Sequence, residues 1–335
     1  MATTTRYKKD KPETGTSQLR ETVGEVLPNG DIVDLIREPS GVALIRYRTG
    51  QPLEIAPKIK SDGIWYCPPD LNPAILGAMP FPQGVSEYGT DEQLFDDIRN
   101  VFRDISELPL DGANTLACCS RGSWLGELMP CFPTFCITAD TMSQAFRVFQ
   151  LLSKLCRRAL LLAQLKPNLP FHLRPTLIVN DPKLSINDCG FWDVCNYPGM
   201  LVCGPKGTLS QLACPRVVFS EPGDPPDLWG DNAIPIMLPS KKLLPLSPQV
   251  LTETAARFQP KLELYRLRKL AGEIPDPAPQ QLPGSDLTRA LPAGRRPRSS
   301  TELDATAGMA RAASSRAAVT QPAGHYRRGP LGACA

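Results

Sequence analysis

The sequence has no run of about 18 to 20 uncharged apolar residues, the length that a membrane-spanning helix requires. Its first residues carry positive charges but no apolar segment behind them, so they do not match a secretory signal. We therefore expect a protein that is neither secreted nor membrane-spanning. Its 11 cysteines are an odd number, and several, such as Cys136 and Cys203, stand among apolar residues, which favours reduced thiols and a cytoplasmic location.

Metal-binding patterns are scarce as well. The chain has only 2 histidines and no C-x-x-C pair. Cys189, Cys195, Cys203 and Cys214 lie close together in the sequence, but their spacing is not that of a zinc site. Buried or incidental thiols are the favoured interpretation, and no metal is expected.

The length of 335 residues and the 42% hydrophobic content allow one large core or two modest ones. The 36 prolines favour many short elements joined by ordered loops. The net charge is +3, and residues 271–335 account for all of it with eight arginines against five acids. The rest of the chain is nearly neutral and lacks the broad basic field that dominates binding to a phosphate backbone.

Three regions precede the tail. Residues 1–20 are polar and predict a flexible leader. Residues 21–70 predict a small antiparallel β module, because Asn29-Gly30 separates β-rich runs and is a strong hairpin signal. Residues 85–270 predict an α/β domain, beginning with an amphipathic helix after Thr90, whose spacing to Gln93 is that of a capping box.

From Thr134 onward, apolar strands alternate with helices. We expect a strand at 134–138, a helix at 142–157, strands at 159–163 and 176–179, and a short helix near 184–194. Further strands are expected at 200–203, 216–220 and 234–238, before a closing helix at 248–270. This alternation predicts a largely parallel, doubly wound sheet flanked by helices.

The tail, residues 271–335, is rich in Pro, Ala, Gly, Ser and Arg, and cannot bury enough surface to offset the entropy lost on ordering. We expect it to be disordered. Its arginines are commonly only solubilising, but they offer a nucleic-acid contact through counterion release. The candidate contacts are Arg295, Arg296, Arg298, Arg327 and Arg328.

The first strand of the α/β domain leads into the place where a P-loop NTPase would bind phosphate. That motif, G-x-x-x-x-G-K-[ST], cradles phosphates with backbone N–H groups, a lysine and a magnesium-binding hydroxyl. The eight corresponding positions here are 139–146. Ala139 and Gln144 replace the glycines, Ala145 the lysine and Phe146 the hydroxyl residue, while Ser143 supplies a nearby hydroxyl.

The stretch from about Tyr88 to Arg268 resembles helicase- or primase-type P-loop ATPases of phage and mobile-element replication, with a RecA/AAA-like sheet. The resemblance rests on the helix 91–105, the segment 151–161, and Arg174-Pro-Thr-Leu-Ile-Val-Asn-Asp181. It implies that Asn180 and Asp181 occupy the paired-acid positions of the Walker B strand, the first acid being replaced by an amide. It also implies that Ser220 stands at the sensor position.

The preferred hypothesis is therefore a catalytically inactive P-loop ATPase-like protein, a binding or scaffold subunit with a protein partner and a DNA-associated role. No catalytic residue and no cofactor are assigned to it. The alternatives are a divergent active ATPase or helicase that uses ATP and magnesium through Asp181 and Ser143, and an interaction protein with no nucleic-acid role.

Overall fold

The computed structural model describes residues 18–166, 169–181, 186–203, 209–224, 228–230, 232–241 and 243–272. The chain divides into two units, Met1–Pro292 and Ala293–Ala335, and all described residues belong to the first. The expected leader up to residue 17 and the tail from residue 273 lie outside the described residues, as do the five candidate arginines of the tail.

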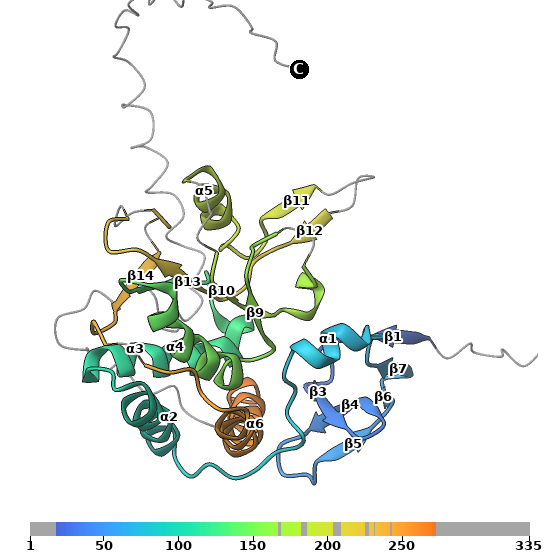
Figure 1. Ribbon diagram of the computed structural model, residues 1–335. Coiled ribbons are helices and arrows are strands. Elements are labelled where there is room, and N and C mark those ends of the chain that lie inside the picture. The colour runs from blue at the N-terminus through green and yellow to red at the C-terminus, as the bar shows by residue number, and fades with distance from the viewer. Residues whose placement is uncertain are drawn as a thin grey trace, which may run out of the picture. The chain divides into compact units, whose positions relative to one another are not determined.

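The β-rich module consists of two sheets (Figure 1). Four antiparallel strands pair in the order β2-β3-β4-β5, with bounds Glu25–Val26, Ile32–Glu38, Gly41–Tyr47 and Glu54–Ala56. Three more pair in the order β1-β7-β6, with bounds Leu19–Glu21, Ile64–Cys67 and Ile59–Ser61. The pair β1·β7 is parallel, which the expected antiparallel meander did not include, and β1 takes up the last residues of the expected leader.

Helices connect the β-rich module to the sheet of the α/β region. They are α1 Pro73–Ala78, α2 Asp91–Ser106 and α3 Leu110–Gly122, followed by the 3-10 helix η1 Ser123–Leu128. The capping box predicted at Thr90 and Gln93 is confirmed. Helix α3 ends at Gly122, where the tighter 3-10 turn η1 begins.

A five-stranded, fully parallel sheet forms the centre of the α/β region, as predicted. Its order is β14-β8-β13-β10-β9, with bounds Ala233–Met237, Thr134–Thr138, Arg216–Ser220, Thr176–Val179 and Ala159–Leu162. The helices of this region are α4 Met142–Leu155, η2 Phe171–Leu173, α5 Ile186–Val194 and α6 Pro248–Leu270.

One expected strand belongs elsewhere. The segment around Met200 to Cys203 does not join the parallel sheet, because β11 Leu201–Cys203 pairs antiparallel with β12 Leu209–Gln211 in a separate hairpin. Apolar content alone does not reveal a strand's partner, since a hairpin strand and a sheet strand have the same residue types.

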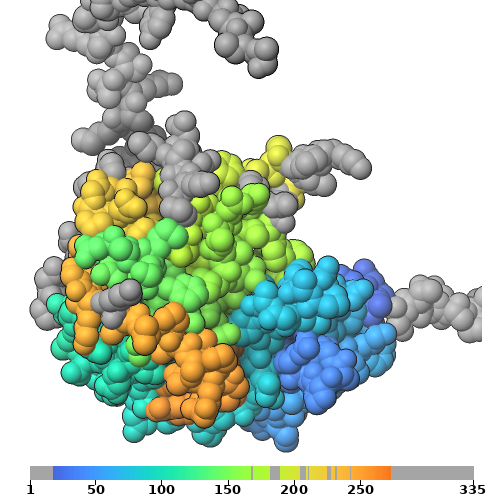
Figure 2. Space-filling view, in the orientation of Figure 1, coloured from blue at the N-terminus to red at the C-terminus, as the bar shows by residue number. Residues whose placement is uncertain are grey.

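Alternation along the strands divides the core between the two faces of the parallel sheet. Ile137, Ile178 and Val217 pack on one face with the buried residues of α2, α3, α4 and α6. On the other face, Leu177 and Val218 belong to a cluster that also contains residues of α5 and of the β-rich module. The module and the parallel sheet therefore share one apolar cluster. In the space-filling view α6, in orange, borders the blue module (Figure 2).

Candidate functional site

The carboxyl ends of three neighbouring strands, β8, β13 and β10, lie at one edge of the parallel sheet. In open α/β sheets this edge is where ligands bind. Ala139 follows β8, Asn180 follows β10 and Ser220 is the last residue of β13, so the fold brings together three of the positions that the sequence singled out. The N–H of Ala139 donates to the carbonyl oxygen of Ser220 at 3.3 Å, which ties the ends of β8 and β13 together.

The turn between β8 and α4 is short. Strand β8 ends at Thr138 and α4 begins at Met142, so only residues 139–141 connect them. The helix begins at Met142, as expected from the sequence, so the motif positions Ser143, Gln144, Ala145 and Phe146 lie within α4 and not in a loop. A three-residue turn has too few N–H groups to surround a phosphate.

The start of α4 uses its polar groups internally. Thr141 and Gln144 form a capping box, in which the N–H of Thr141 donates to Oε1 of Gln144 at 3.1 Å. The N–H of Gln144 is also within 3.1 Å of the carbonyl oxygen of Thr141, and the hydroxyls of Thr141 and Ser143 are 3.0 Å apart. Next to them, Oδ2 of Asp140 accepts from the hydroxyl of Ser240 at 2.7 Å. The turn thus places a carboxylate, rather than a cation, beside the helix N-terminus.

Ala145, at the expected lysine position, has an exposed fraction of 0% and packs in the core beneath the sheet. A longer side chain at this point of α4 would enter that buried cluster rather than solvent. The position therefore does not fit a phosphate-binding lysine in this backbone.

The residues that the resemblance assigns to the Walker B and sensor positions form local hydrogen bonds. The N–H of Leu165 donates to Oδ2 of Asp181 at 3.4 Å, so this carboxylate contacts the loop after β9. The hydroxyl of Ser220 donates to Oδ2 of Asp224 at 3.0 Å, and this oxygen also accepts from the N–H of Glu221 at 2.7 Å. Asn180 is half-buried, with Oδ1 lacking a hydrogen-bond partner among the described residues.

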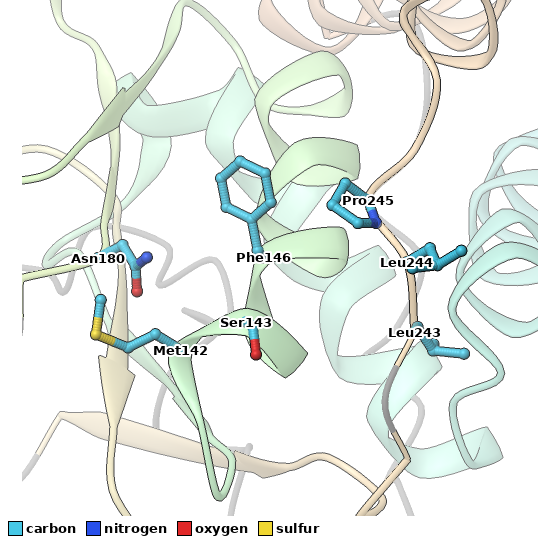
Figure 3. Close-up of a pocket in the computed structure, with 7 residues that line it drawn as sticks. All are labelled: Met142, Ser143, Phe146, Asn180, Leu243, Leu244 and Pro245. Atoms are coloured by element: carbon cyan, nitrogen blue, oxygen red, sulfur yellow. The ribbon is translucent and has the colours of Figure 1, made fainter.

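A small pocket of about 200 Å³ lies between α4, the end of β10 and the segment before α6 (Figure 3). Its lining residues are mostly apolar: Met142, Ser143, Phe146, Asn180, Leu243, Leu244 and Pro245. The segment is fixed to α4 by Arg147, which donates to the carbonyl oxygen of Leu244 at 3.2 Å, and by Gln150, whose Oε1 accepts from the N–H of Leu246 at 2.8 Å. No charged side chain lines the pocket within the described part of the chain, so it is not a phosphate site.

The sequence interpretation missed a buried cluster of charges, which we call the Asp34 cluster: Asp34, Glu127, Arg157, Arg158 and Arg266. Asp34 lies on β3 and is 1% exposed. Its Oδ2 accepts from Arg157 at 2.9 Å and from Nε of Arg266 at 2.6 Å, while Oδ1 accepts from Arg158 and from the N–H of Leu35. One carboxylate thus connects the β-rich module to α6 and to the turn after α4.

Glu127, on η1, completes the cluster. It forms two hydrogen bonds with Arg266, at 2.6 and 2.7 Å, and an ion pair with Arg174 at 3.0 Å. Burial opposes ionisation of both acids, but the nearby guanidinium groups outweigh it and hold the pKa values of Asp34 and Glu127 well below their usual range. Both carboxyls are therefore ionised at neutral pH.

A sequence signal for this cluster exists. Asp34 interrupts the apolar run Ile32-Val33-Leu35-Ile36 in the centre of a strand, where a charged residue is rarely buried without a partner. Arg157 and Arg158 follow α4, and with exposed fractions of 4% and 2% they are buried beside the carboxylate of Asp34 with which they pair.

The described helices include none that is long and apolar enough to cross a bilayer. Within the same residues, no group of three or more His, Cys, Asp or Glu side chains is arranged to hold a metal ion.

No protein-family model matches the sequence, and no curated protein matches it significantly. Among solved structures, the chain is similar to an apo A-form structure of the NrS-1 C-terminal region, with 8% identity and a TM-score of 0.36, over 71% of this chain and 68% of that one. A second apo structure of that region, residues 305–718, gives 10% identity and a TM-score of 0.32, over 69% and 65%.

Proposed function

We propose that this chain is a catalytically inactive relative of P-loop ATPases that acts as a binding or scaffold subunit. The observation that carries the proposal is the three-residue turn between β8 and α4, whose polar groups are bonded within the protein. It stands at the sheet edge where such an ATPase would bind its phosphates.

Three requirements of phosphoryl transfer are unmet at this edge. Ala145 is buried where the lysine would stand, Asn180 replaces the first Walker B acid, and Asp140 adds negative charge beside the helix N-terminus. Lysine and magnesium neutralise the charge that develops on the transferred phosphoryl group. Each tenfold in rate corresponds to about 1.4 kcal/mol of transition-state stabilisation, so losing several such groups together removes most of the catalysis.

The competing proposal is a divergent active ATPase in which Asp181 and Ser143 hold magnesium. Two contacts argue against it: Oδ2 of Asp181 accepts from the N–H of Leu165, and the Ser143 hydroxyl lies 3.0 Å from that of Thr141. Both groups would have to leave these contacts to bind magnesium.

Calorimetric titration of the full-length protein with MgATP and MgADP, combined with a phosphate-release assay, tests the proposal. We expect no binding at micromolar nucleotide and no turnover above that of buffer. Micromolar affinity with magnesium-dependent turnover would overturn it, provided that Asp181→Ala abolishes the turnover and the matched change Asp104→Ala, at an exposed position of α2, does not.

Association with nucleic acid is a second proposal, carried by the charge of the tail. The eight arginines of residues 271–335 include Arg295, Arg296 and Arg298 in one run and Arg327-Arg328 after a tyrosine. Replacing these five by glutamine in the full-length chain should abolish a mobility shift of single-stranded DNA that is present at low salt and weakens as salt rises. An unchanged shift would assign any binding to the rest of the chain, and no shift in the natural protein would leave a protein partner as the sole role.

A further inference from the structure

Glu263 is a buried acid that the ion pairs of the Asp34 cluster do not include. It lies on α6, one turn before Arg266, and its exposed fraction is 1%. Its Oε1 is buried and has no hydrogen-bond partner among the residues that the structure describes. A buried carboxylate without such bonds is costly if it is ionised and much less costly if it carries a proton.

The guanidinium donors around Glu263 are directed at other acceptors. Arg266 donates to Asp34, to Glu127 and, at 2.7 Å, to the carbonyl oxygen of Trp124. Arg158 donates to Asp34, to the carbonyl oxygen of Val23 and, at 2.8 Å, to that of Leu173.

Arg157 is similarly occupied. Its Nη2 donates to both carboxylate oxygens of Asp34, and its Nη1 lies 3.7 Å from Oε1 of Glu127. None of these hydrogen bonds goes to Glu263, because the donors of the three arginines are directed at the two ionised acids and at backbone carbonyl oxygens.

The charged groups that act on Glu263 include Asp34 of β3, Arg157 and Arg158 of the turn after α4, and Arg266 of α6. Burial is the largest influence and raises the pKa of Glu263 to about 8; the charge of Asp34 acts in the same direction, while the three arginines oppose them. The hydrogen-bond geometry and the direction of this shift agree that Glu263 is protonated at neutral pH.

We propose that Glu263 is a proton-dependent latch on the seam where β3 meets α6 and the turn after α4: the seam is closed while Glu263 holds its proton, and it opens with release of that proton. Opening admits water to the carboxyl, which then ionises. Because the Asp34 cluster lies in the same seam, the contact between the β-rich module and the parallel sheet becomes less stable as pH rises.

Proton linkage determines whether a rise in pH favours opening or closing of the seam. An exposed glutamate ionises near pH 4.5. Between that value and about pH 8, the open state has lost its proton and the closed state has kept it. Each pH unit in this window therefore favours opening by about tenfold, and the effect levels off once the closed state also ionises.

Hydrogen exchange of the full-length protein, followed by mass spectrometry between about pH 6 and pH 9, tests the latch. Rates are corrected for the intrinsic pH dependence with an unfolded reference. We expect the opening constant of peptides covering β3 and β4 to rise by about tenfold per unit up to roughly pH 8 and then to level off. Glu263→Gln should make this profile flat, because the amide cannot release a proton.

Glu253→Gln is the matched control, since Glu253 lies on the same helix but is exposed. It should leave the pH profile of the natural protein unchanged. The proposal is overturned if Glu263→Gln keeps the slope, or if the natural protein has no slope. Should Glu263→Gln fail to fold, infrared spectroscopy of the natural protein decides: a protonated-carboxyl band present at about pH 6.5 and lost by about pH 9 supports the latch, and its absence at pH 6.5 overturns it.

Discussion

Replacing Asp34 by asparagine should be among the most destabilising conservative changes in the protein. The amide has nearly the same size but removes the one negative charge that Arg157, Arg158 and Arg266 share. It also turns an NH2 group toward guanidinium donors, which cannot accept a hydrogen bond. The perturbation is therefore electrostatic, with little change in packing volume.

The magnitude follows from what is left behind. Breaking a buried ion pair by removing one partner costs about 3–5 kcal/mol, because the other charge stays buried without compensation. Glu127 still binds Arg266 in the variant, which limits the loss for that residue. We expect the free energy of unfolding to fall by about 3–5 kcal/mol, corresponding to a drop in Tm on the order of 10 °C for a region of this size.

Urea denaturation followed by tryptophan fluorescence measures this loss. Trp124 is a suitable reporter, since it is fully buried, its indole N–H donates to the carbonyl oxygen of Leu155 at 2.9 Å, and its own carbonyl accepts from Arg266. The matched control is Asp62→Asn in the same module, where the side chain is exposed and a change within about 0.5 kcal/mol is expected. A loss of less than about 1 kcal/mol for Asp34→Asn would refute the view that the Asp34 cluster holds the seam together.

Three further outcomes are expected. Gly24→Ala should lower the free energy of unfolding by more than about 1 kcal/mol in the same urea assay, because Gly24 has φ +113° and a Cβ there would lie 2.6 Å from Oδ1 of Asp34. Gly30→Ala, at φ +85° but with open space around it, should lower it by less. Ala145→Lys should lower Tm markedly without creating ATP affinity, because it buries an amine under the sheet. The control Ser143→Lys, on the exposed side of α4, should lower the free energy of unfolding by under about 1 kcal/mol. Nucleotide binding by Ala145→Lys would contradict the site geometry. The free energy of unfolding should fall as pH drops below about 4, because the pKa of Asp34 is lower in the folded protein than in the unfolded chain, so acid protonates Asp34 first in the unfolded state. This dependence on pH should be weaker in Asp34→Asn. An equal dependence in both proteins would count against an ionised Asp34 in the folded state.

Much of the local structure was predictable from the sequence. Strands β8, β10 and β13 have the predicted bounds because each is a distinct apolar run, and the closing helix α6 does so because it begins with Pro248 after the N-cap Ser247. The capping box of Thr90 and Gln93 was also predicted from its local spacing. The expected strand at 134–138 and helix at 142–157 likewise predicted the three-residue turn before α4.

The sequence by itself determined that a largely parallel sheet with flanking helices forms and where most of its strands lie, but it wrongly added the segment 200–203 to that sheet. Only the tertiary structure decided the pairing of charges: Asp34 meets Arg157 across 123 positions and Arg266 across 232. Local sequence patterns reveal periodicity and helix capping, but they do not reveal which distant residues are in contact. In the sequence, the cluster is therefore only an aspartate within a strand and two arginines after a helix. Burial in one low-dielectric seam makes them a single electrostatic unit.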